Sequence, residues 1–308
     1  MNQQTHPKIE NVTTGGALAL GNFDGVHRGH QAVIRTAIDK AHAEGTKALV
    51  LTFEPHPRTV LKPNIPPFRL TPAPVKERLL KSLGVDGIIT LPFTPEFSNL
   101  TAEEFVQQIL IDALKVKHIV AGFDYVFGHK RGGTMALLRQ WLAPHQVGVT
   151  EITPFRDSSG NVMSSSRTRE ALQQGDLETA GHILGRPWAI AGNVQEGAKR
   201  GTSIGVPTLN IPLADYLRPK FGVYAVSARR LKNNALYHGV ANIGTRPTVD
   251  GTTELLEVHV FDFAEKVYGE EWEIALQSFI RPERKFANLD ELKVQIGKDI
   301  QSAKDAKA

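Results

Sequence analysis

The stretch 17–30, ALALGNFDGVHRGH, predicts a buried strand, a tight loop and the beginning of a helix. Its first four residues are apolar, which is typical of a strand that is covered on both faces. Gly21 ends this run, and turn-forming residues follow it. Apolar residues then recur at helical spacing over 30–45, HQAVIRTAIDKAHAEG, where the final glycine closes the pattern. We therefore predict strand, loop and helix in that order.

Two histidines, His27 and His30, fall in or just before the first turn of that helix. Residues three apart lie on one helix face, and a helix N-terminus carries unpaired N–H groups and a partial positive charge. Two imidazole donors added there would suit a phosphate chain. A bare H-x-x-H pattern is also common in ordinary surface or core pairs. Metal binding is disfavoured because the chain has no cysteine and no third ligand at metal spacing nearby.

The rest of the first half alternates expected strands with expected helices. The strands are 47–53, 86–91, 117–122 and 147–152, and the helices are 74–83, 101–114 and 135–142, with a proline-punctuated loop at 54–63 and a helix pair over 171–184. Because the strands are apolar runs, the alternation predicts a parallel sheet covered on both faces. Ligands of such sheets bind beyond the carboxyl ends of the strands. We expect GNFDGVH (21–27), EPHP (54–57) and GFDYVFGHKRGG (122–133) to converge on one crevice there.

Several of these stretches resemble one enzyme family. HRGH (27–30) is similar to the H-x-G-H signature of the nucleotidyltransferase superfamily, and GNFDGVH resembles the adenylyltransferase domain of the bacterial bifunctional riboflavin kinase/FAD synthetases. GFDYVFG and SSSRTR (164–169) resemble two further motifs of that domain. The resemblance implies catalytic roles for His27 and His30, and a flavin contact for Phe127. The ATP-binding residues that it implies are Gly21, Asn22, Phe23, Asp24, His27, His30, Asp124, Ser164, Ser165 and Arg169.

The pattern changes near residues 181–187, where short strands separated by turns begin. We expect strands at 188–194, 207–211, 221–228, 236–243, 254–263 and 271–279, and an amphipathic helix at 289–303. Such a run of short strands predicts an all-β barrel or sandwich. The expected architecture is thus an α/β Rossmann-like nucleotidyltransferase domain at 1–184. A six-stranded, barrel-like all-β domain with a C-terminal helix follows at 185–308.

The second half has candidate phosphate and metal ligands of its own. The glycines and basic residues of GNVQEGAKRGTSIGVPTLN (192–210) suit a loop that wraps phosphates. Thr208 and Asn210, two apart on an extended chain, would point the same way, and oxygen ligands at that spacing can hold Mg²⁺ with phosphates. A proline-threonine turn entering a strand is the simpler alternative. Glu257 alternates with apolar neighbours, which is compatible with a solvated strand face or with a catalytic carboxylate.

Together, the strings of this half resemble the riboflavin kinase module. They include G-x-P-T-x-N ending at 210, GVY (222–224), GVANIGTRPT (239–248), the E-x-H that begins at 257 and RPERKF (281–286). The resemblance implies that Glu257 is the catalytic base and that Thr208 and Asn210 bind the metal. The implied ATP-binding residues are Gly192, Lys199, Gly201, Gly205, Thr208 and Asn210, and the implied flavin-binding residues are Phe127, Gly222, Tyr224 and Arg281.

The family implies two successive reactions. ATP would phosphorylate riboflavin to FMN, and a second ATP would adenylylate FMN to FAD with release of pyrophosphate, with Mg²⁺ as the metal. The chain has no apolar run that could span a bilayer and no signal-peptide core. We therefore expect a cytoplasmic enzyme of small-molecule partners (riboflavin, FMN, FAD and ATP), without nucleic acid or membrane, as a monomer or weak homo-oligomer.

Two alternatives remain open at this point. One of the two domains could be inactive, although every polar group of both motif sets is present. The chain could instead be a nucleic-acid-binding regulator, given its sequence pI of about 9.2, although its net charge of +4 is mild. That alternative predicts binding that weakens steeply with salt, and the sequence shows no concentrated basic stripe or stacking-aromatic platform.

Overall fold

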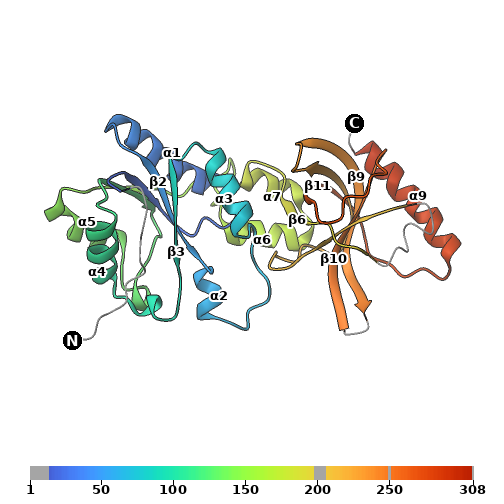
Figure 1. Cartoon of the computed structure of the whole chain (residues 1–308), viewed down its shortest axis with the longest axis horizontal. Coiled ribbons are helices and arrows are strands. Elements are labelled where there is room, and N and C mark those ends of the chain that lie inside the picture. The colour runs from blue at the N-terminus through green and yellow to red at the C-terminus, as the bar shows by residue number, and fades with distance from the viewer. Residues whose placement is uncertain (1–13, 198–205, 249–250, 307–308) are drawn as a thin grey trace. The chain divides into compact units, whose positions relative to one another are not determined.

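The computed structural model describes residues 14–197, 206–248 and 251–306, and it divides into two compact units (Figure 1). The first unit comprises the chain up to Pro66 together with Thr71–Ser164. The second comprises Pro67–Leu70 and the chain from Ser165 onward. Within the described residues, no helix is both long and apolar enough to cross a bilayer.

The first unit is built on a five-stranded parallel sheet, as predicted. Its strands are β1 (Ala17–Leu20), β2 (Ala48–Glu54), β3 (Gly87–Pro92), β4 (His118–Gly122) and β5 (Gly148–Ile152), in the spatial order β3-β2-β1-β4-β5. The chain moves outward from β1 in one direction and then returns to β4 on its other side. Because ligands bind where the strand order reverses, the loops after β1 and β4 lie at the expected position for a site.

Helices cover both faces of this sheet. They are α1 (Arg28–Ala43), α3 (Ala73–Ser82), α4 (Ala102–Glu104) continuing into η2 (Phe105–Ala113), and α5 (Met135–Leu142). The short α2 (Pro57–Leu61) follows β2 and buries none of its residues. Alternate residues of β1 face opposite layers: Leu18 packs with Phe105 and Ile109, whereas Ala19 packs with Ile34 and Ala37 of α1. A strand buried on both sides explains the apolar run that opens the fold.

Two details of the first unit differ from the sequence prediction. The expected helix 101–114 begins with the capping box of Thr101 and Glu104, but continues as a π-helix. Residues 54–63 are not wholly loop, because α2 forms within them. Its N-terminus is stabilised by the His56 ring, which accepts from the backbone N of Arg58 at 3.0 Å, and by Pro57 at the first helical position.

The second unit is a nearly closed antiparallel barrel. Its strands are β6 (Ala189–Asn193), β7 (Leu209–Pro212), β8 (Gly222–Arg230), β9 (Ala235–Thr248), β10 (Gly251–Val260) and β11 (Glu271–Pro282), in the order β6-β11-β8-β9-β10-β7. The backbone N of Gln195 donates to the carbonyl of Asn210 at 2.8 Å, which draws the two edge strands together. The predicted fold class is therefore confirmed for both halves.

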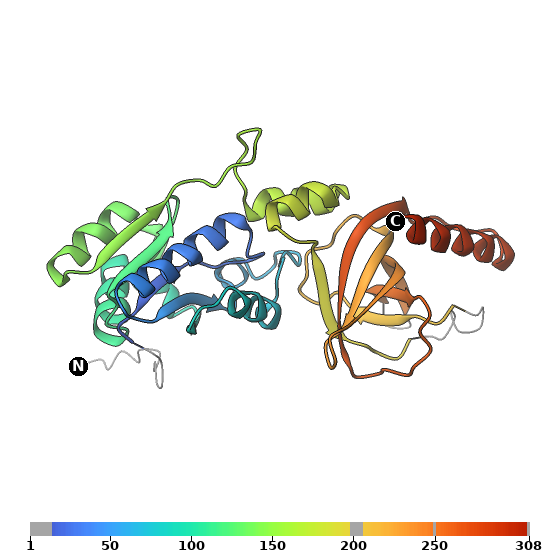
Figure 2. The ribbon, with the colours of Figure 1, turned by 90° about the horizontal axis from the view of Figure 1, so that it is seen from above.

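Among the described residues, the helices that accompany this barrel are α6 (Ser165–Gln174), α7 (Leu177–Leu184) and α9 (Leu289–Asp305). Figure 2 shows α9, in red, lying alongside the barrel. Ile300 and Ala303 of α9 pack on Val223, Ala225 and Val240, which point outward from β8 and β9. The helix thus covers the outer face of the sheet, while residues such as Tyr224 and Ile243 fill the barrel interior.

Candidate active sites

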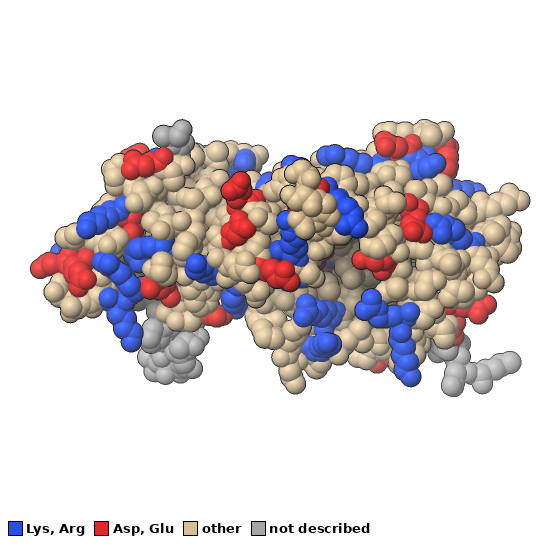
Figure 3. All heavy atoms as spheres, turned by 180° about the vertical axis from the view of Figure 1, so that it is seen from behind, with Lys and Arg blue, Asp and Glu red and all other residues tan. Residues whose placement is uncertain are grey.

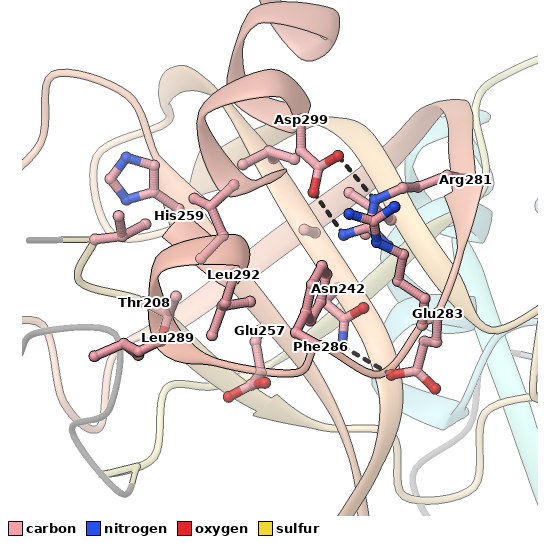
Figure 4. A pocket seen from close by; sticks show the side chains of 16 residues that line it. Thr208, Asn242, Glu257, His259, Arg281, Glu283, Phe286, Leu289, Leu292 and Asp299 are labelled. Atoms are coloured by element: carbon pink, nitrogen blue, oxygen red, sulfur yellow. Dashed lines mark hydrogen bonds and ion pairs between the residues drawn. The ribbon is translucent and has the colours of Figure 1, made fainter. Parts of the chain in front are cut away.

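A cavity of about 570 Å³ lies in the second unit, between α9 and the outer face of β8, β9 and β10 (Figure 4). This volume is within the usual range for small-molecule sites. The residues that line it are Val206, Thr208, Val223, Val240, Ala241, Asn242, Glu257, His259, Arg281, Glu283, Arg284, Phe286, Leu289, Leu292, Ile296 and Asp299.

A row of three polar residues crosses the outer face of the barrel, and two of them, Glu257 and Asn242, line this cavity. Glu257 on β10 is the register partner of Asn210 on β7 and of Asn242 on β9. Directly opposed residues of antiparallel strands point to the same face, so the three side chains lie side by side with the carboxylate in the middle. Leu256 and Val258 are buried in the barrel interior, which directs Glu257 outward to the cavity. The carboxylate is therefore part of a cavity wall rather than of an open strand face.

Thr208 and Asn210 provide oxygen atoms near Glu257. Thr208 lines the cavity, and Asn210 is buried with 5% of its surface exposed. The Asn210 side-chain N donates to the carbonyl of Thr208 at 3.2 Å, whereas its Oδ1 has no hydrogen-bond partner among the described residues. A buried acceptor without a partner costs about 1–3 kcal/mol, and a cation would relieve this cost. Lys199, Gly201 and Gly205 lie outside the described residues.

The remaining flavin-contact predictions have different positions around the cavity. Arg281 lines it, but its guanidinium forms two hydrogen bonds to Asp299 of α9, Nε to Oδ1 at 2.9 Å and Nη2 to Oδ2 at 2.6 Å. Tyr224 points to the opposite face of β8, is fully buried, and has its pKa raised by that burial. Gly222 has a φ of +154°, and a Cβ there would collide with the Arg281 carbonyl. Gly192, which was predicted to bind ATP rather than flavin, lies in edge strand β6.

Several polar cavity residues, Asn242 and His259 among them, were not assigned a role from the sequence. Asn242 lies within GVANIGTRPT and donates from Nδ2 to Glu283 at 3.1 Å. His259, two residues after Glu257, places Nδ1 2.9 Å from the Pro207 carbonyl. Both belong to quoted motifs, so their positions were signalled, but only the strand register shows that they face the cavity.

In the first unit, the two histidines meet at the start of α1. His27 is the N-cap residue, and its Nδ1 accepts a hydrogen bond from the backbone N of His30 at 3.3 Å. The two rings are stacked with their centroids 3.6 Å apart. Because a backbone N–H only donates, Nδ1 of His27 is unprotonated, and the neutral ring carries its proton on Nε2. The prediction that both histidines share one face at the helix N-terminus is confirmed.

The loop before these histidines turns several predicted ATP contacts inward. Phe23 is 1% exposed and packs in the core, and Asp24 is 2% exposed and accepts from the backbone N of Thr71 at 2.9 Å. A Cβ on Gly21 would approach the Phe23 ring to 2.9 Å, so a larger residue there would disturb the loop. The Asn22 carbonyl lies 3.4 Å from Nζ of Lys76. These residues therefore stabilise the conformation of the loop.

The other predicted transferase residues come from several parts of the chain. Asp124 is exposed in the loop after β4, whereas Phe127 is 8% exposed and packs on Phe105 with ring centroids 5.6 Å apart. Ser164 ends the first unit, while Ser165 and Arg169 belong to α6 of the second. A joint role of these residues with the histidines stays a prediction.

Comparisons with known proteins identify both domains. The FAD synthetase family model matches residues 9–167, and the riboflavin kinase model matches residues 184–307. These matches define the class: a two-domain enzyme in which a riboflavin kinase follows an FAD synthetase.

Sequence relatives identify the family more closely. Bifunctional riboflavin kinase/FMN adenylyltransferases from Haemophilus influenzae (42% identical, covering 95% of this chain and 94% of the relative) and Bacillus subtilis (40% identical, 97% and 95%) match nearly end to end. The chain belongs to the bifunctional riboflavin kinase/FMN adenylyltransferase family. A crystal structure from Streptococcus pneumoniae, described as a macrolide-efflux protein, is 34% identical with a TM-score of 0.82, covering 94% of this chain and 93% of that one. Its description differs from those of the relatives, and the family assignment rests on the latter.

Proposed function

We propose that the chain makes FAD in two ATP-dependent steps. In the cavity beside α9, the γ-phosphoryl group of ATP is transferred to riboflavin, which gives FMN. The loop and helix after β1 serve the transfer of AMP from a second ATP to FMN, which gives FAD and pyrophosphate. The observation that carries the kinase assignment is the register of Asn210, Glu257 and Asn242, because it sets one carboxylate between two amides, with Glu257 and Asn242 on the cavity wall.

In the kinase step we assign the general base to Glu257. The riboflavin hydroxyl must lose a proton as it attacks the γ-phosphorus, and a carboxylate within hydrogen-bond reach can accept it. Apolar residues of α9 such as Leu289 and Leu292 line the same cavity and suit an aromatic ring system. Substrate and base would then share one cavity.

Thr208 and Asn210 are the residues that would hold a divalent cation, which we take to be Mg²⁺. Their oxygens are the hard ligands that Mg²⁺ prefers, and the buried Oδ1 of Asn210 fits such a role. When bound with ATP, the cation supplies charge neutralisation for the phosphoryl group in transfer.

The adenylyl transfer needs no general base, because the nucleophile is the phosphate of FMN, which is anionic at neutral pH. The work is positioning and stabilisation of charge on the α-phosphate and on the leaving pyrophosphate. His27 offers Nε2–H for this task, and His30 stands stacked on it at the helix N-terminus. We assign triphosphate binding to Ser164, Ser165 and Arg169 on the strength of their motif alone.

We further assign residues 1–184 to the adenylyltransferase domain and 185–308 to the kinase domain. The limits of the two family matches, 167 and 184, support this boundary. Action in the cytoplasm as a monomer or weak homo-oligomer remains our expectation from the sequence.

A time course with riboflavin, ATP and Mg²⁺ tests the proposal, with flavins separated by chromatography. FMN should rise first and FAD should follow, and omission of Mg²⁺ should abolish both products. FMN alone would contradict the transferase assignment, and no conversion would contradict both.

A further inference from the structure

The loop between β1 and α1 has a backbone that most residues avoid. Phe23 has a φ of +52°, and the β-branched Val26 has a φ of +43°. Each such residue costs roughly 1–3 kcal/mol and persists only where its surroundings hold it. His27 follows Val26 directly, so the conformation of this loop sets where the histidine pair stands.

Thr71, in the segment that leads into α3, holds the loop from one side. Its hydroxyl accepts from the backbone N of Gly25 at 2.8 Å and lies 3.3 Å from Oδ1 of Asp24, to which it donates. Its backbone N donates to the same carboxylate oxygen at 2.9 Å. Thr71 and Asp24 are each 2% exposed, so these bonds are shielded from water. They fix the two residues that lie between the strained positions.

Lys76 in α3 stabilises the loop between β1 and α1 through contacts at the carboxyl end of β2. Its ammonium group is paired with Glu54 at 2.7 Å, donates to the Thr52 hydroxyl at 2.9 Å and lies 3.4 Å from the Asn22 carbonyl. The lysine is 2% exposed. Burying a charge is costly unless it is paired and hydrogen-bonded, and here the contacts join the ends of β1 and β2.

We infer that Thr71 and Lys76 are positioning residues for adenylyl transfer. Neither belongs to a motif that the sequence singles out, and both are too deeply buried to reach a substrate. They act through the loop, which they keep in the strained conformation that presents His27 and His30. The inference rests on the proposed function of this loop in adenylyl transfer.

The test compares Thr71→Val with Thr71→Ser in the full-length chain. Valine keeps the shape of threonine but removes the hydroxyl, whereas serine keeps the hydroxyl. We expect Thr71→Val to lower kcat for FAD formation from FMN by about 10- to 100-fold, since a small misplacement of catalytic groups is that costly. KM for ATP should change less than threefold, Thr71→Ser should stay within about threefold of the parent, and FMN formation should not change in either variant.

Assays run well below the unfolding transition of each variant separate positioning from mere loss of folded protein. A structural role would reduce the folded fraction and leave kcat per folded molecule unchanged. If Thr71→Val does not fold, the pair Glu54→Gln with Lys76→Met, which removes both charges of this ion pair, takes its place with the same expected loss of kcat. A folded variant that keeps full kcat, or a serine variant as impaired as valine, overturns the inference. Absence of FAD formation by the parent chain would instead overturn the proposed function.

Discussion

His259 supports the kinase site through a single backbone contact. Its Nδ1 lies 2.9 Å from the carbonyl of Pro207, one residue before Thr208. A carbonyl oxygen only accepts, so Nδ1 carries the proton, and the ring tautomer is fixed by its neighbour. The histidine thereby holds the turn that presents the Thr208 hydroxyl to the cavity.

This contact predicts a difference between two substitutions of similar size but different polarity. In His259→Asn, the side-chain amide can take the place of Nδ1, so KM for ATP in FMN formation should remain within about threefold of the parent. In His259→Leu the bond is lost, and one hydrogen bond is worth about 1 kcal/mol, so KM should rise roughly fivefold to tenfold. Steady-state kinetics with saturating riboflavin measure both. Equal kinetics in the two variants would contradict a role for Nδ1, and FAD formation from FMN is the internal control.

At the scale of single residues, the sequence predicted which side chains belong to a site better than it predicted the direction in which they point. His27 and His30 stack as their spacing indicates, because helix geometry alone fixes residues three apart. Asp24 and Phe127 turn inward instead, since an irregular loop has no period from which a direction follows. Asn242 was not predicted as a site residue, because only the pairing of β9 with β10 brings it beside Glu257.

Among the elements, α9 is joined to the barrel by a shielded ion pair. Arg281 of β11 and Asp299 of α9 have side chains that are 19% and 6% exposed, and Gln295 donates a further bond to Asp299 at 2.7 Å. Removing one partner of such a pair leaves a charge that is poorly solvated, which typically costs about 3–5 kcal/mol for a fully buried pair and less here. The pair fixes the helix that forms one wall of the cavity.

We therefore predict that Asp299→Asn raises KM for riboflavin about 5- to 20-fold and lowers the melting temperature of the second unit. The matched control is Asp290→Asn, on the first turn of the same helix, which does not line the cavity and should change neither quantity. Riboflavin titration of FMN formation and thermal unfolding provide the two readouts. An unchanged KM in Asp299→Asn would show that the ion pair does not shape the cavity.

His118 at the start of β4 gives the first unit a dependence on pH. Burial lowers the pKa of this histidine below its ordinary value of 6.5, although Glu44 opposes the shift. A lowered pKa means that the unfolded chain binds the proton more readily, so stability is full above pH 6.5 and declines as the pH falls below it. Thermal unfolding at pH 7.5 and 5.5 should show a larger loss for the parent than for His118→Gln. An equal loss in both would exclude His118 as the cause.

Element types were predictable where one period dominates. The apolar runs of the five parallel strands and the stripe of α9 were found near their predicted positions. The π-helix of η2 was not, because an apolar face over 105–113 is compatible with either winding. The short helix α2 was missed since its N-cap is a histidine, which lies outside the usual capping residues.

At the scale of the whole molecule, the kinase cavity and the histidine pair belong to different units. The kinase cavity is formed entirely by residues of the second unit, and the histidine pair lies in the first. On the face drawn in Figure 3, basic and acidic side chains are interspersed, which does not favour the nucleic-acid alternative that the sequence pI had left open. The order of the two folds along the chain, a parallel sheet followed by a barrel, was predictable because the sequence changes near residues 181–187 from alternating strands and helices to short strands separated by turns.

The claim that two separate sites perform two reactions is tested most directly with His30→Ala and Glu257→Ala. Each variant is assayed for FMN formation from riboflavin and, separately, for FAD formation from supplied FMN. We predict that His30→Ala loses FAD formation by at least about 100-fold and keeps FMN formation, whereas Glu257→Ala does the reverse. Equal loss of both activities in either variant would contradict separate sites.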